Sequence, residues 1–168
     1  MQLKTTLLAA AVVAAGLAVQ PLDTAQAATT ISSNMTVKIK IQNACQITTA
    51  PSTLDFLTAG PLTANVNSTA TFGVTCTSQA PYNIGMGAGL NASGGVNRMT
   101  DGSGNYVSYA LYQDSARTTP WGNTVGTNTE PGTGNGSEQT ITVYGQVAPQ
   151  TTPPAGNYQD TVAVTVTF

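Results

Sequence analysis

Residues 160–168, Asp-Thr-Val-Ala-Val-Thr-Val-Thr-Phe, decide the fold class, because apolar residues recur along them at every second position. Val162, Val164, Val166 and Phe168 would share one face of an extended chain, and the residues between them would share the other. This alternation is typical of a strand with one face in a core and the other in water. We therefore predict a β-strand that ends at Phe168, and we expect these four side chains to face the core.

The same period of two recurs upstream, and no stretch after residue 27 has the pattern of a helix. Further strands are predicted within residues 31–41, 69–76, 82–86, 106–112 and 140–147. Glycine-rich loops are predicted at residues 85–104, 123–137 and 148–157. Short alternating strands separated by turn-rich loops indicate an all-β fold, an antiparallel sandwich of two sheets in a single domain.

The first 27 residues have the organisation of a secretory signal peptide. Lys4 precedes the apolar run 7–19, and small residues stand at Ala25 and Ala27. The run is too short to span a bilayer, which disfavours the alternative of an N-terminal membrane anchor. We predict cleavage after Ala27, and export of the remaining chain.

Cys45 and Cys76 are the two cysteines of the chain. In the oxidising compartment that export implies, an even pair most simply forms one disulfide. The alternative is a reactive thiol or a metal ligand. The chain has no histidine, which disfavours metal binding.

The composition disfavours catalysis and nucleic-acid binding. Without histidine, a Ser-His-Asp or Cys-His arrangement cannot be built, and no spacing links two of the scattered carboxylates. Charged residues are only 7% of the chain and form no basic patch. We predict no enzyme activity, no cofactor, no metal, no nucleic-acid partner and no small-molecule substrate.

Three weak motifs have ordinary structural interpretations. Residues 101–105 resemble a calcium loop slightly, but a tight turn is favoured because the expected glutamate and glycine positions do not match. Trp121, Tyr109 and Tyr112 could form a sugar-binding platform, but packing in the core or covering a sheet edge is favoured. Asp160 is interpreted as a hydrogen-bonding residue at the start of the last strand.

Two longer stretches carry a resemblance to a known family. Residues 106–122 (YVSYALYQDSARTTPWG) and 142–168 (TVYGQVAPQTTPPAGNYQDTVAVTVTF) resemble the spore coat protein U domain, a family that includes the subunits of archaic, Csu-type chaperone–usher pili. The resemblance implies an incomplete immunoglobulin-like β-sandwich that lacks its last strand and is completed by a donor strand from another subunit. It also implies neighbouring copies or related pilins, a periplasmic chaperone and an outer-membrane usher as partners, a location on the cell surface, and a role in adhesion and biofilm formation.

On this interpretation residues 28–41 are a donor-strand extension and residues 42–168 are the pilin domain. Residues 30–40 contain neither proline nor glycine and are apolar on one face only, as strand addition requires. The donor side chains would be Ile31, Met35, Val37 and Ile39, and the acceptor groove, also the chaperone contact, would include Val162, Val164, Val166 and Phe168.

Three alternatives remain open at this point. Residues 30–41 could form an ordinary first strand that pairs within its own chain. The protein could also be a secreted coat or matrix protein, or a monomeric adhesin domain that binds a surface or a sugar.

Overall fold

The computed structural model describes residues 28–168, and the predicted signal peptide lies outside the described residues. The chain divides after Ile39 into two units, and each is considered by itself.

The first unit has no helix or strand in residues 28–39, and its side chains are exposed. Among its large apolar residues the least exposed is Val37, which is 81% exposed. The strand predicted within residues 31–41 is therefore absent from this chain's own structure, where residues 28–44 carry no regular element. Alternation alone does not make a strand, because a strand also requires a hydrogen-bonded partner.

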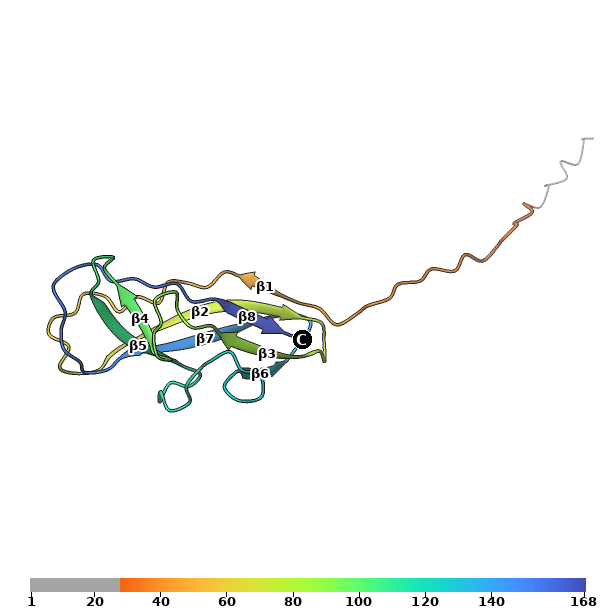
Figure 1. Cartoon of the computed structure of the whole chain (residues 1–168). Coiled ribbons are helices and arrows are strands. Elements are labelled where there is room, and N and C mark those ends of the chain that lie inside the picture. The colour runs from red at the N-terminus through yellow and green to blue at the C-terminus, as the bar shows by residue number, and fades with distance from the viewer. Residues whose placement is uncertain (1–27) are drawn as a thin grey trace, which may run out of the picture. The chain divides into compact units, whose positions relative to one another are not determined.

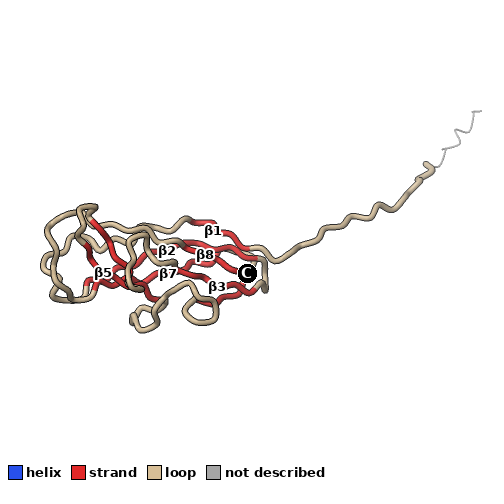
Figure 2. The backbone as a smooth tube through the Cα atoms, viewed as in Figure 1, coloured by secondary structure: helices blue, strands red, loops and turns tan. Residues whose placement is uncertain are grey.

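Residues 40–168 form the second unit, in which all regular structure is strand (Figure 2). The strands are β1 (Cys45–Thr49), β2 (Val66–Cys76), β3 (Pro81–Met86), β4 (Asn97–Thr100), β5 (Tyr106–Tyr112), β6 (Glu130–Thr133), β7 (Glu138–Val147) and β8 (Val164–Thr167). In residues 28–168 no helix has the length and hydropathy needed to cross a membrane.

The strands form two antiparallel sheets (Figure 1). The larger sheet has the order β1-β2-β7-β5-β4, and the smaller has the order β6-β3-β8. Both contain neighbours that are distant in sequence, such as β2 beside β7 and β3 beside β8. The prediction of an all-β fold with two antiparallel sheets is confirmed.

The core lies between the sheets and consists of the alternating residues that the sequence indicated. Phe72 and Val74 of β2 and Ile84 of β3 are almost completely buried. The other strands contribute Val107, Tyr109, Leu111, Val143 and Val147 to the same core. Trp121 and Tyr109 are buried, which confirms their interpretation as core residues.

Two short strands lie inside segments that the sequence analysis assigned to loops. β4 falls within residues 85–104, and β6 falls within residues 123–137. Asn97 and Arg98 of β4, and Pro131 and Gly132 of β6, give no strand pattern. These strands form because β5 and β3 offer them backbone partners.

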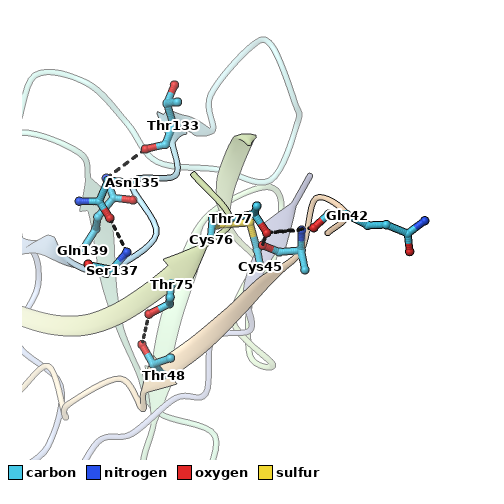
Figure 3. Close-up of a disulfide and its surroundings, with 11 residues drawn as sticks. Gln42, Cys45, Thr48, Thr75, Cys76, Thr77, Thr133, Asn135, Ser137 and Gln139 are labelled. Atoms are coloured by element: carbon cyan, nitrogen blue, oxygen red, sulfur yellow. Dashed lines mark hydrogen bonds between the residues drawn. A yellow bond between two sulfur atoms is a disulfide. The ribbon is translucent and has the colours of Figure 1, made fainter. Parts of the chain in front are cut away.

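The disulfide joins Cys45 to Cys76, as predicted (Figure 3). The two residues are direct neighbours in the register of β1 and β2, at the first rung of that ladder. Their separation of 31 residues in sequence corresponds to a stabilisation of about 3–4 kcal/mol in the chain-entropy treatment. The disulfide therefore fixes β1, an edge strand, to its neighbour β2 in the larger sheet.

Replacing both cysteines by alanine should lower the free energy of unfolding by about 3 kcal/mol, because the unfolded chain regains the freedom of the closed loop. Urea unfolding followed by tryptophan fluorescence would measure the change. A thiol reductant should lower the stability of the wild type and leave the double variant unaffected. Equal unfolding midpoints for the two proteins would contradict the assigned role of the disulfide.

Candidate functional site

β1 and β8 are the edge strands of the two sheets on one side of the sandwich, and some of their Cα atoms lie within 8 Å of each other. β1 pairs with β2 on one side, and β8 pairs with β3 on one side. Within residues 28–168 no strand pairs with the other side of either. We call these two free strand edges the open edge. It comprises β1, β8 and residues 162–163, which precede β8.

Apolar side chains of the core are only partly covered along the open edge. Val164 and Val166 stand opposite the buried Met86 and Ile84 of β3, so they share the core-facing side of the smaller sheet. Val162, Val164 and Val166 pack against the core but are half-buried. An edge of this kind exposes both unpaired backbone groups and apolar surface.

The predicted groove residues do not all have the same position. Val162 precedes β8, and Phe168 follows it and is 59% exposed. β1 contributes Ile47, which is 40% exposed and stands opposite the buried Val74. Ile47 was not identified from the sequence; its spacing of two from Cys45 is the signal that was available.

The opposite side of the sandwich is closed by main-chain hydrogen bonds. Trp121 N donates to Leu111 O of β5 at 2.8 Å, and Met86 N of β3 donates to Gly122 O at 2.9 Å. The indole Nε1 of Trp121 donates to Ile84 O at 2.9 Å. Residues 121 and 122 therefore join the two sheets, and this contrast makes the open edge a specific feature of the fold.

Asp160 fixes the chain immediately before β8. Its Oδ1 accepts hydrogen bonds from Asn91 N at 3.2 Å and Asn91 Nδ2 at 3.0 Å, and its Oδ2 accepts one from Tyr109 Oη at 2.8 Å. Gly89 leaves the space that this carboxylate occupies, since a Cβ there would collide with Asp160 Oδ2. The interpretation of Asp160 as a structural hydrogen-bonding residue is confirmed.

Burial, followed by the hydrogen bond with Asp160, raises the pKa of the Tyr109 hydroxyl far above its usual range. Tyr109 therefore keeps its proton at ordinary pH and acts as the donor in this pair. The contact ties the chain that precedes β8 to β5 in the opposite sheet.

Thr77 holds the chain that leads into β1 (Figure 3). Its Oγ1 donates to Gln42 O at 3.0 Å and accepts from Ala44 N at 3.2 Å, while its own N donates to Ala44 O at 2.9 Å. The disulfide follows at the next residue, so the start of β1 is fixed both covalently and by hydrogen bonds.

A polar hollow lies between residues 90–102 and 157–161. It has a volume of about 370 Å³ and contains Asp101 and Asp160, but both carboxylates are bound by neighbouring groups. Asp101 accepts hydrogen bonds from Ser103 N and Asn105 N, which confirms a turn at residues 101–105. Across residues 28–168 no cluster of three metal-ligating side chains is present.

Comparison with known proteins identifies the family. The model of the Spore Coat Protein U domain matches residues 31–165. Protein U of Myxococcus xanthus is 34% identical over 181 aligned residues, which cover 99% of this chain and 98% of that protein.

A solved structure shares the fold: the CsuC–CsuE chaperone–tip adhesion subunit pre-assembly complex from archaic chaperone–usher Csu pili of Acinetobacter baumannii. The match has a TM-score of 0.53 at 22% identity and covers 76% of this chain but only 40% of the matched chain. It confirms the immunoglobulin-like all-β class. The family match extends over most of the chain and agrees with the curated relative, so this chain belongs to the spore coat protein U domain family.

Proposed function

We propose that this protein is a structural subunit of a surface pilus, assembled by the chaperone–usher route through donor-strand exchange. The open edge carries the proposal, because it combines unpaired backbone with half-buried valines, on the side of the sandwich away from the link at residues 121 and 122. Family membership and the fold shared with a chaperone–usher complex support it.

The proposed acceptor groove is the open edge, with Val162, Val164, Val166 and Phe168 on the β8 side and Ile47 on the β1 side. A strand added there would pair with the free edges and cover these side chains. A periplasmic chaperone would supply such a strand before assembly, and a neighbouring subunit would supply it in the pilus. An outer-membrane usher would be the site of exchange.

The proposed donor is the extension of residues 28–41, whose apolar side chains are exposed. At roughly 1.5–3 kcal/mol for each buried side chain, four apolar residues contribute on the order of 6–12 kcal/mol before the cost of ordering the segment. The donor residues would be Ile31, Met35, Val37 and Ile39.

The proposed subunit has no catalytic activity and needs no cofactor. It passes through the periplasm to the cell surface, where the assembled pilus supports adhesion and biofilm formation. Its role is carried by strand pairing and burial of apolar surface.

One other function has an observation in its favour. The relative that matches almost end to end is Protein U, and the family description names the spore coat, so a coat or matrix protein is the second candidate. A sugar-binding adhesin is less well supported, because the buried Trp121 and Tyr109 cannot form a surface platform.

Deleting residues 28–40 should abolish assembly between subunits. We expect the wild type, co-expressed with its chaperone and usher, to give a ladder on an unheated SDS gel that collapses on boiling. The truncated chain should give monomer only. Monomer from both chains would overturn donor-strand exchange and leave a coat or binding domain as the better function.

Val37→Asp should abolish the ladder, whereas Thr36→Asp should preserve it. Both variants add one carboxylate to the exposed extension, but only position 37 would face the groove, where an unpaired charge is costly to bury. Thr36→Asp is the matched control, and thermal unfolding of both monomers should match the wild type. Equal loss of the ladder in the two variants would contradict a face-specific donor strand.

A further inference from the structure

β1 contains a β-bulge close to its end. Ile47 is paired with Val74 of β2, but Thr49 is paired with Gly73, the next residue along β2, so Thr48 is an extra residue. A bulge places two residues of one strand opposite one residue of its partner and bends the strand. It therefore determines where β1, one side of the open edge, stops following β2.

A single carboxylate oxygen binds both threonines at the bulge. Glu138 Oε2 accepts hydrogen bonds from Thr48 Oγ1 at 2.6 Å and from Thr49 Oγ1 at 2.8 Å. Thr48 Oγ1 also lies 3.1 Å from Thr75 Oγ1 of β2. Since both hydroxyls reach the same atom, the bulge turns two consecutive side chains toward one side of the strand.

Glu138 reaches β1 across an intervening strand. It belongs to β7, where it is paired with Thr75, and β2 lies between β7 and β1. The side chain passes over Gly73: a Cβ at that position would lie 2.5 Å from Glu138 Cδ and 2.6 Å from Oε2. The absence of a side chain at Gly73 is thus what allows a residue of β7 to hold β1.

The two hydrogen bonds favour the ionised carboxylate. The hydroxyl of Thr48, followed by that of Thr49, lowers the pKa of Glu138. β1, β2 and β7 carry no other Asp, Glu, Lys or Arg, so Glu138 is the only formal charge on the strands that it touches. Because its folded-state pKa is depressed, the contribution is present above the ordinary carboxyl pKa and is lost as pH falls through the folded-state value.

We propose that Glu138 is a positioning residue for the open edge: from β7 it holds the bulge of β1 across Gly73 and so fixes the β1 side of the strand-acceptor groove. The statement that this edge accepts a donor strand rests on the proposed function. The structural part of the inference, the control of β1 by Glu138, stands independently of what binds there. Protonation of Glu138 loosens β1 from the sheet while the disulfide still retains its first residue.

Hydrogen exchange measured by mass spectrometry on the full exported chain tests the structural part. Glu138→Gln should reduce the protection of residues 46–49 at neutral pH by about twofold to fivefold, since a solvent-exposed, charge-assisted contact is replaced by weaker ones. Glu130→Gln, a carboxylate on β6, is the matched control and should leave this protection unchanged. Equal protection of β1 in wild type and Glu138→Gln would overturn the proposal.

The pH dependence separates this role from a general structural one. After correction for intrinsic exchange rates, protection of β1 in the wild type should fall as the pH drops below the ordinary range of a glutamate pKa, because the hydrogen bonds from Thr48 and Thr49 lower the pKa of Glu138. In Glu138→Gln it should be independent of pH over that range. A parallel fall in both proteins would show that another group is responsible and would contradict the assignment to Glu138.

A double-mutant cycle at Gly73 tests the crossing geometry. Gly73→Ala should reduce the protection of β1 as strongly as Glu138→Ala, because the added methyl group displaces the carboxylate. In the Glu138→Ala background the same substitution should have little further effect. Additive losses would contradict the contact.

Binding of a synthetic peptide of residues 28–41 separates this inference from the proposed function. Peptide binding to the wild type and weaker binding to Glu138→Gln would support both. If the peptide binds neither protein while β1 protection still depends on Glu138, the donor-strand function fails and the positioning role stands. If the peptide binds both proteins equally and β1 is unchanged, the positioning role fails and the function stands.

Discussion

The antiparallel ladder between β2 and β7 is the constraint on which the rest of the structure depends. It runs from Val66 opposite Val147 to Thr75 opposite Glu138. On its two sides, β1 pairs with β2 and β5 pairs with β7. Its inward residues, including Phe72 and Val143, form the floor of the core. β2 and β7 are far apart in sequence, so their pairing must form before β1 and β5 can take their places beside the core.

The sandwich built on that ladder is asymmetric. One side is closed by the backbone around Trp121, whereas the other ends at β1 and β8 with apolar side chains half-buried. Residues outside the open edge keep its two strands in place: Asp160 holds the chain before β8, and Cys76 and Glu138 hold β1. The domain thus holds β1 and β8 in place although each is paired on one side only. An added strand would need such ordered, half-paired strands to bind to.

The sequence predicted the strands whose alternation reflects burial, and it predicted the disulfide from composition and compartment. β1, β4 and β6 were missed. Only Cys45 of β1 is even half-buried, and Arg98 and Pro131 report nothing about burial, so these strands exist through pairing with β2, β5 and β3. The valines before Phe168 were identifiable from their period, whereas Ile47 and the closure at Trp121 depend on contacts between distant segments. The bulge at Thr48 also had no local signal, since it is held by a residue 90 positions away.

The place of the disulfide has a mechanical consequence. A pulling force on the chain that precedes β1 would act first on the Cys45–Cys76 end of the β1–β2 ladder. Without a covalent link at that end, the hydrogen bonds of the ladder would break one after another. The Cys45–Cys76 bond is that link, so tension bypasses the hydrogen bonds of β1 and enters the end of β2 through a covalent bond. The longest strand of the larger sheet then bears the force along its whole length of pairing with β7, in shear, which resists rupture far better than peeling does.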